Sequence, residues 1–268
     1  MVLPDGRSFE LSRELLNGAI DVHVHATPHL TSSPRRLDPI QAATQARDAG
    51  MRAIVLMDVF QMTNGLAWVV NKTVPDFEVY GGLILNTMFG GLNPRAVKTA
   101  MKYGDGAKFI SFGTHSTYFQ ASREGRVVDG IFIPLSDLYP EFRREELERS
   151  IRIPLEGPVG PELEEILGLI AANPHTFLNT GHVSPEEAMR LVDLAQEYGI
   201  KEVLVATGVT KAASTNQLEH MASKGAYIEY TMAAYTHTTP IPKTHYYAEL
   251  AYAAIDEGMP GEISGGIR

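Results

Sequence analysis

Short apolar runs alternate with amphipathic stretches along most of the chain, and each repeat has the same order of residue types. A capping residue, often followed by proline, opens a helical stretch, a glycine ends it, and an apolar strand follows. Residues 38–57 give the first clear example, and residues 184–206 give the best one. In the latter, Ser184 and Glu187 have the spacing of a capping box. This pattern predicts a repeated helix–strand unit.

Further units cover residues 93–113, 161–179 and 214–232, and residues 244–258 predict another helix. The predicted strands lie near Ile20, Ala53, Val79, Phe109, Phe177, Val203 and Ile228, with a short last one near Ile263. Strands that alternate with helices of this length indicate parallel βαβ units. Seven or eight units in about 250 residues predict an α/β fold of the (β/α)8 TIM-barrel type, with a short or altered last strand.

A doubly wound open sheet is the alternative fold. It usually has a glycine-rich turn after the first strand, where this chain has His25-Ala26-Thr27-Pro28. Residues 116–160 are too long for a plain loop after the fourth strand, and we interpret them as an insertion. The expected organisation is therefore one barrel domain over residues 1–268, with an insertion that lies over the barrel mouth or forms a subunit contact.

Composition narrows the class of protein. The chain has 268 residues, of which 44% are hydrophobic and 21% charged, which is typical of a globular domain. A formal net charge of -9 argues against nucleic-acid binding, and the lack of cysteine excludes disulfides and thiolate metal sites. No apolar run approaches the roughly 20 residues that span a bilayer, and the first residues do not resemble a signal peptide. We expect a cytoplasmic protein that does not bind membranes.

Histidines collect at predicted strand ends, where a parallel barrel carries its function. Of nine histidines, six lie at or just past a strand: His23, His25, His29, His115, His182 and His237. His23 and His25 are two apart on the first strand, so alternation places both rings on one face and Val22 and Val24 on the other. A lone His-x-His is more often a hydrogen-bonded pair than a metal site, but the position on a first barrel strand favours ligands. His182 follows the fifth strand on the same rim, and we interpret it as a third ligand rather than a helix-entry residue.

Three further residues are catalytic candidates. Asp58 ends the second strand and would contact a metal, orient a histidine or simply cap a turn. Glu229 lies within an apolar strand, and a buried carboxylate must be paired or neutral, so it is a candidate hydrogen-bond partner, ligand or base. His115 follows the fourth strand. It is a candidate fourth ligand or proton shuttle, or else a solvated loop residue. His29, His237 and Tyr235 are candidate substrate contacts in loops.

The motif Asp21-x-His23-x-His25 on a first barrel strand, with His182 after the fifth, resembles the amidohydrolase superfamily, and more closely a little-characterised branch of amidohydrolase-related barrels. The stretches that carry the resemblance are residues 21–28, 50–56, 82–86, 91–94, 180–187 and 225–229. The resemblance implies that His23, His25 and His182 bind a divalent cation, zinc first and manganese or iron as alternatives. Such a cation polarises the scissile group and lowers the pKa of bound water to about 7 for zinc. The implied reaction is hydrolysis of an amide, lactone or ester bond in a small molecule.

The chain departs from the superfamily pattern at four strand ends. The second strand ends at Asp58 instead of in Lys and His, the fourth has His115 where Lys or Glu is common, the sixth lacks a terminal His, and no Asp follows Glu262 on the eighth. A reduced, mononuclear site follows. The alternatives are a diverged barrel that acts as a binding or structural subunit, and a metal-dependent lyase or isomerase. We expect a homo-oligomer, or a hetero-oligomer with a related barrel.

Overall fold

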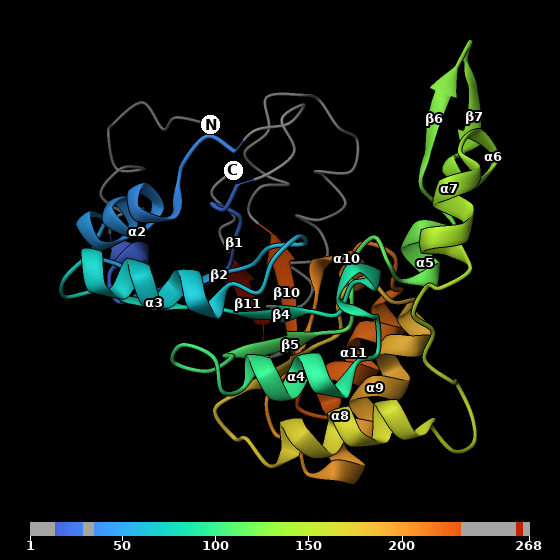
Figure 1. The fold of residues 1–268 in the computed structure, drawn as a ribbon. Coiled ribbons are helices and arrows are strands. Elements are labelled where there is room, and N and C mark those ends of the chain that lie inside the picture. The colour runs from blue at the N-terminus through green and yellow to red at the C-terminus, as the bar shows by residue number, and fades with distance from the viewer. Residues whose placement is uncertain (1–13, 29–34, 232–260, 265–268) are drawn as a thin grey trace.

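The computed structural model describes residues 14–28, 35–231 and 261–264, which form a mixed α/β fold built on parallel strands (Figure 1). One sheet has the order β1-β2-β3, and a second has the order β11-β10-β9-β8-β5-β4, with every pairing inside them parallel. Their bounds are β1 Ile20–Val24, β2 Ala53–Leu56, β3 Glu78–Tyr80, β4 Gly82–Ile84, β5 Phe109–Ser111, β8 Phe177–Asn179, β9 Val203–Val205, β10 Tyr227–Thr231 and β11 Gly261–Ser264.

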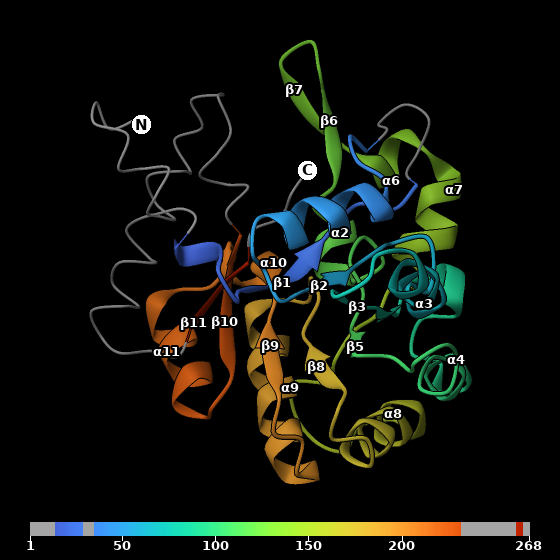
Figure 2. The same cartoon turned by 90° about the vertical axis from the view of Figure 1, so that its left-hand side faces the viewer.

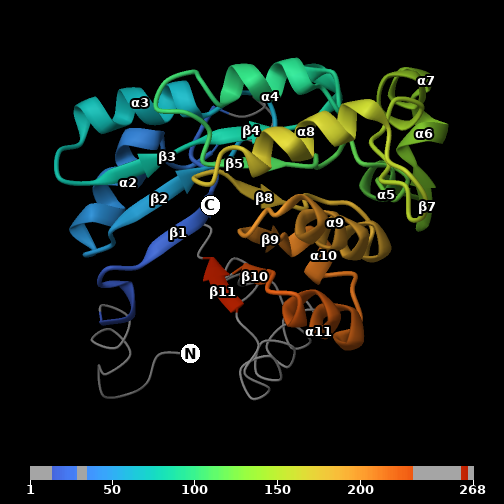
Figure 3. The ribbon, with the colours of Figure 1, turned by 90° about the horizontal axis from the view of Figure 1, so that it is seen from below.

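The two sheets meet at both ends. Gly81 alone separates β3 from β4, so one extended segment belongs to both sheets. At the other side, β11 pairs with β10 over four residues and also contacts β1. Figure 3 shows the strands from below, with the helices outside them. The carboxyl ends of the parallel strands therefore lie on one side of the molecule, where His23, His25 and His182 are found.

Apart from α3, the longer helices begin where the sequence pattern predicts. The longer ones are α2 Pro39–Asp48, α3 Asn64–Thr73, α4 Pro94–Ala100, α8 Pro161–Ala171, α9 Pro185–Tyr198 and α11 Thr215–Ser223. The side chain of Ser184 accepts a hydrogen bond from the Glu187 amide, and the Glu187 side chain accepts from the Ser184 amide. This capping box supplies acceptors for amides that a helix start otherwise leaves open. No helix in the described part of the chain combines the length and hydrophobicity needed to cross a membrane.

The strands near all eight predicted positions are present, including the last one. The sequence pattern did not indicate α3, and the helix predicted over residues 244–258 lies outside the described residues. The segment 116–160 also differs in detail, because its apolar stretch forms an antiparallel hairpin of β6 Gly125–Val128 and β7 Ile131–Pro134. Its charged part is divided into α7 Pro140–Phe142 and a π-helical turn, Arg143–Leu147. The hairpin projects from the body in Figure 1 and Figure 2.

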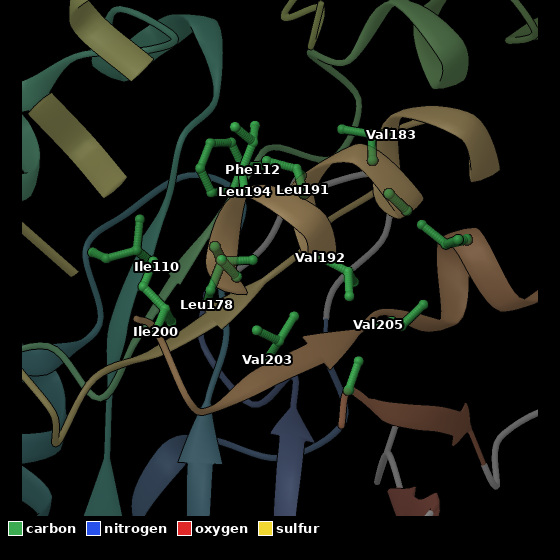
Figure 4. Packing of buried hydrophobic residues seen from close by; sticks show 14 of the residues in the cluster. Ile110, Phe112, Leu178, Val183, Leu191, Val192, Leu194, Ile200, Val203 and Val205 are labelled. Atoms are coloured by element: carbon green, nitrogen blue, oxygen red, sulfur yellow. The ribbon is translucent and has the colours of Figure 1, made fainter. Parts of the chain in front are cut away.

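Side chains alternate between two faces of the strands. Ile110 and Leu178 pack outward with helix residues such as Leu191 and Leu194, as Figure 4 shows. Phe109 belongs instead to a separate inner cluster, against which Phe177 packs with ring centroids 5.9 Å apart. Strands that are covered on both faces read as apolar runs, which is why the sequence indicates parallel rather than half-exposed strands.

Gly81 provides a test of the joint between the two sheets. A Cβ atom at this position would lie 2.4 Å from the Thr63 carbonyl carbon and 2.5 Å from the Asn64 amide nitrogen, both of them backbone atoms. We predict that Gly81→Ala lowers the free energy of unfolding by about 1–3 kcal/mol, the usual cost of overpacking. Urea unfolding followed by circular dichroism measures it.

Gly168→Ala is the matched control, since nothing lies within 4 Å of the added atom on α8. It is expected to raise the free energy of unfolding by roughly 0.5–1 kcal/mol through helix propensity. Equal stability of the two variants would contradict the close approach of α3 to the joint.

Candidate functional site

His23 and His25 are brought together at the carboxyl end of β1. Their Nε2 atoms lie 3.0 Å apart, and the rings meet edge to face at an interplanar angle of 67°. The other nitrogen of each ring has its own acceptor. His25 Nδ1 lies 2.9 Å from the Met57 carbonyl oxygen, and His23 Nδ1 lies 2.8 Å from Glu229 Oε1.

These partners determine where the ring protons are. A carbonyl oxygen only accepts, so the His25 Nδ1 atom carries a proton, and a neutral His25 has its lone pair on Nε2. The Glu229 carboxylate fixes the His23 proton on Nδ1 in the same way. Two lone pairs at 3.0 Å repel each other unless a positive charge lies between them. The pair therefore fits either a shared proton or a divalent cation, and neutral imidazole is a good ligand for the latter.

A strand irregularity shapes this pair. The register between β1 and β2 shifts between Asp21 and Val24. As a result Val24 packs outward among residues of α2, whereas Val22 packs against the inner cluster with Val55 and Met57. The prediction that Val22 and Val24 share a face is therefore wrong, because a local bulge inserts one extra residue in β1 relative to β2. The two imidazoles converge nevertheless.

Glu229 is fixed in the site by burial and by hydrogen bonds to both of its carboxylate oxygens. Its side chain is fully buried at the centre of β10, where Ile228 and Tyr230 face the outer core. Oε1 accepts from His23, and Oε2 accepts from the Thr207 amide at 2.7 Å. Burial lowers the pKa of His23, but the charge and hydrogen bond of Glu229, together with Asp21, outweigh burial and raise it. Glu229 is thus an inward residue that orients His23.

Asp21 is a site residue that sequence reasoning used only as part of a motif. It is buried on β1, and its Oδ1 accepts from the His23 amide at 3.0 Å. Burial raises its pKa to about 6, a rise that the hydrogen bond and the charge of His23 partly oppose and Glu229 reinforces. Two carboxylates therefore bond to His23, Asp21 to its backbone amide and Glu229 to its ring.

His182 occupies the predicted strand end after β8. Its Nδ1 is buried without a hydrogen-bond partner in the described part of the chain. Its backbone amide donates to the Gly113 carbonyl, and its carbonyl accepts from Thr117 Oγ1. Burial, reinforced by the positive charges of His23, His115 and Lys211, lowers its pKa to about 3, so the ring is neutral. The ring rests on Gly208, where a Cβ atom would come within 2.3 Å of His182 Cδ2. The sixth strand end, which lacks the superfamily histidine, thus makes room for this ring.

Asp58 and His115 have other partners. Asp58 is buried, and its Oδ1 accepts from the Phe60 amide at 2.6 Å, which is the turn-capping arrangement. His115 is largely exposed, and its Nδ1 pairs with Glu124. The hydrogen bond to Glu124 raises the pKa of His115, burial opposes that rise, and the charges of Glu124 and Glu146 add to it.

Asn179 is a candidate that the sequence did not single out. It is buried on the inner face of β8, and its Oδ1 accepts from the Gly181 amide at 2.8 Å and from Ser111 Oγ at 3.0 Å. Since a backbone amide only donates, this fixes the orientation of the carboxamide, and its Nδ2 is left as a buried donor without a partner. No local motif marks such a residue, and only the pairing of β5 with β8 reveals it.

The predicted substrate contacts His29, His237 and Tyr235 lie outside the described residues. Within the described ranges, no three His, Asp or Glu side chains are grouped so that they could hold one metal ion. The donor set that does fit a cation there is the His23–His25 pair, with the neutral His182 ring as a neighbour. The convergence of all three imidazoles on one cation stays a prediction.

Comparison with known proteins assigns the chain to a protein family. The model of a family of unknown function, DUF6282, matches residues 18–229. The chain belongs to this family. The DUF6282 match begins before β1 and ends at Glu229, so it contains His23, His25, His182 and their carboxylate partner. No curated protein matches the sequence significantly.

Solved structures share the fold of this DUF6282 chain. The lactonase Lmo2620 from Listeria monocytogenes is 13% identical with a TM-score of 0.55, and the match covers 95% of this chain and 79% of the lactonase. A probable 2-pyrone-4,6-dicarboxylic acid hydrolase from Acinetobacter baumannii is 14% identical at a TM-score of 0.52, over 93% of this chain and 84% of that one. An organophosphorus hydrolase mutant from Deinococcus radiodurans is 12% identical with a TM-score of 0.52, and the match covers 94% of this chain and 76% of the hydrolase. At these identities the likeness is one of fold.

Gly208→Ala tests the position of the His182 ring. Gly208 lies in the short helix α10, Thr207–Thr210, where the backbone conformation suits alanine. The His182 ring must therefore move to make room for the new Cβ atom. We predict a shift of the His182 ring signals in a ¹H–¹³C NMR spectrum. Gly160→Ala, whose Cβ would meet only Glu162 Oε2 at 3.6 Å, is the control and leaves them unchanged. Unaltered His182 signals in Gly208→Ala would contradict the contact.

The His115–Glu124 pair gives a prediction about pH. In the unmodified chain the His115 ring titrates above its ordinary value of 6.5. Glu124→Gln removes the charge that favours the imidazolium, so the midpoint falls, and the ring loses its proton at lower pH. An NMR titration of the His115 ring signals measures both midpoints. A midpoint that does not respond to Glu124→Gln would show that the pair does not form.

Proposed function

We propose that this chain is a metal-dependent hydrolase of the amidohydrolase type that acts on a lactone or ester bond of a small molecule. We also propose that its two sheets close into one (β/α)8 barrel through Gly81 on one side and the β1–β11 contact on the other. The fold likeness to hydrolases named as acting on a lactone, a pyrone dicarboxylic acid and organophosphorus compounds supports this class.

The observation that carries the proposal is the pair of Nε2 atoms at 3.0 Å. Both Nδ1 atoms donate to protein acceptors, and hydrogen bonds of this kind orient metal-binding histidines and fix their tautomer. His23 and His25 would hold the cation, and His182 is proposed as the third ligand because its ring is neutral and its Nδ1 has no partner. Zinc is the first choice for imidazole donors, with manganese and iron as alternatives.

When bound, the cation polarises the scissile group and makes water acidic enough to react near neutral pH. The residues of this chain prepare that chemistry. Glu229 holds the His23 proton on Nδ1, and the Met57 carbonyl does the same for His25. Asn179 offers a fixed, buried donor to a ligand oxygen, since its Nδ2 has no partner among the described residues. Glu229 therefore acts as a positioning residue through His23.

Proton transfer to solvent is assigned to His115. Of the three residues predicted to be catalytic, Glu229 accepts hydrogen bonds on both oxygens, from His23 and from the Thr207 amide. Asp58 caps a local turn by accepting from the Phe60 amide. His115 is exposed, and Glu124 can stabilise its protonated form. We infer that His115 exchanges protons with water and that His29, His237 and Tyr235 contact the substrate. A homo-oligomer, or an assembly with a related barrel, remains part of the proposal.

Metal content and turnover test the proposal together. The unmodified protein, purified and supplied with zinc, is expected to retain about one metal ion per chain by elemental analysis and to open lactones or esters from a panel. The double variant His23→Ala/His25→Ala should lose both properties. His220→Ala on the surface of α11 is the control that keeps both.

The outcomes separate the alternatives. Stoichiometric metal without turnover of any lactone, ester or amide would favour a binding subunit. Turnover without incorporation of water would favour a lyase or isomerase. Metal that persists in the double variant would contradict the assignment of the His23–His25 pair.

A further inference from the structure

A cavity of about 480 Å³ opens at the amino ends of the strands, opposite the histidine pair. Many of its lining residues stand at the first positions of successive strands or just before them, for example Ile20 on β1, Glu78 on β3 and Tyr227 on β10. His23 and His25 lie at the other end of β1. The cavity therefore does not belong to the site described above, and its volume falls within the range of about 300–1,000 Å³ that small-molecule sites occupy.

The walls of this cavity are apolar and aromatic. Val22, Val55 and Leu204 line it, together with the rings of Tyr80 and Phe177. Val22, Tyr80 and Phe177 pack only on the edge of the inner cluster and are half-buried. Barrel interiors are ordinarily filled by layers of side chains at this end as well. The first layer here instead leaves room beside two aromatic rings.

The charges at the mouth are unevenly compensated. Arg52 lies 3.6 Å from Glu78, and Glu78 also accepts from the Tyr80 hydroxyl at 3.1 Å. The Lys108 ammonium lies 5.3 Å from the centroid of the Tyr80 ring and forms no ion pair with any residue in the described ranges. The side of the mouth formed by β2, β3 and β5 thus carries one excess positive charge next to an aromatic wall.

Glu202 is the opposing feature. It lies before β9, two strands away from Lys108, and it forms no ion pair within the described part of the chain. Adjacent strands are about 4.8 Å apart, so the two positions are separated by about 10 Å along the sheet, and Lys108 leans away toward Tyr80. A single anionic group at Lys108 can therefore be bound without contact to Glu202, although the Glu202 charge opposes it at longer range.

We propose that the amino-end cavity binds a small carboxylic acid with an aromatic or branched apolar body. The body lies between Tyr80 and Phe177, and the carboxylate pairs with Lys108. The pairing of Lys108 with a carboxylate beside an apolar wall gives a charge-assisted hydrogen bond in a partly desolvated position, where such bonds are strong. This inference does not rest on the proposed hydrolase activity.

The experiment uses three probes with one skeleton: 3-phenylpropionate, its neutral amide and 3-phenylpropylamine. Binding to the full chain is measured by calorimetry at low salt and by NMR shifts of the Tyr80 and Phe177 rings. The carboxylate is expected to bind with a Kd in roughly the micromolar to millimolar range, the amide about tenfold more weakly, and the amine not at all.

Two surface variants give opposite expectations. Lys108→Met keeps the apolar stem of the side chain. It should weaken binding of the carboxylate about tenfold and leave the Kd of the amide unchanged. Glu202→Gln removes the opposing charge and should tighten the carboxylate. The proposal is overturned if the carboxylate fails to bind, if Lys108→Met leaves its Kd unchanged, or if the amine binds better than the carboxylate. Since His23 and His25 are untouched, metal content measured in the same samples reports separately on the hydrolase proposal.

Discussion

The hydrogen bond between His23 and Glu229 is the contact on which the rest of the site depends. It joins residues 206 positions apart and connects β1, in one sheet, with β10, in the other. A fully buried carboxylate needs compensating partners, and Glu229 has two in His23 and the Thr207 amide. The same bond that satisfies Glu229 therefore fixes the His23 ring and ties the two sheets together across their interior.

The geometry of the histidine pair follows from that bond. With its Nδ1 proton directed at Glu229, His23 presents Nε2 to His25, whose own Nδ1 proton is directed at Met57. Neither ring can turn away without leaving a buried acceptor unsatisfied, which costs about 1–3 kcal/mol. The arrangement is thus held by the protein before any ligand arrives, and pre-organisation of this kind is what a metal site requires.

The sequence predicted the order of elements well because that order rests on local chemistry. The capping box of Ser184 and Glu187 and the apolar run of residues 53–56 are visible without knowledge of the fold. His23 and His25 could also be paired from the His-x-His spacing, although the bulge in β1 breaks the alternation of Val22 and Val24 on which that inference was based. Helix α3 is not capped in this way, since the side chain of its N-cap residue, Thr63, accepts no hydrogen bond from the first amides of the helix. The partners of Glu229 could not be assigned, because only the fold brings the His23 ring and the Thr207 amide near it. Asp58 is a local case, since its partner is the Phe60 amide two residues further on, and a turn cap was one of the roles that the sequence left open.

Two unsatisfied groups at the end of β8 support a functional role for that region beyond the histidine pair. Within the described residues, Asn179 Nδ2 and His182 Nδ1 are both buried without partners, although their neighbouring atoms are well bonded. Each such group destabilises the folded chain by about 1–3 kcal/mol unless something else bonds to it. The fold uses Asn179 Oδ1, which accepts from the Gly181 amide and from Ser111 Oγ, but it gains nothing from the two unpartnered nitrogens. These nitrogens belong to residues three apart in the sequence, and their presence is explained if a ligand at the carboxyl end of the sheet completes their hydrogen bonding.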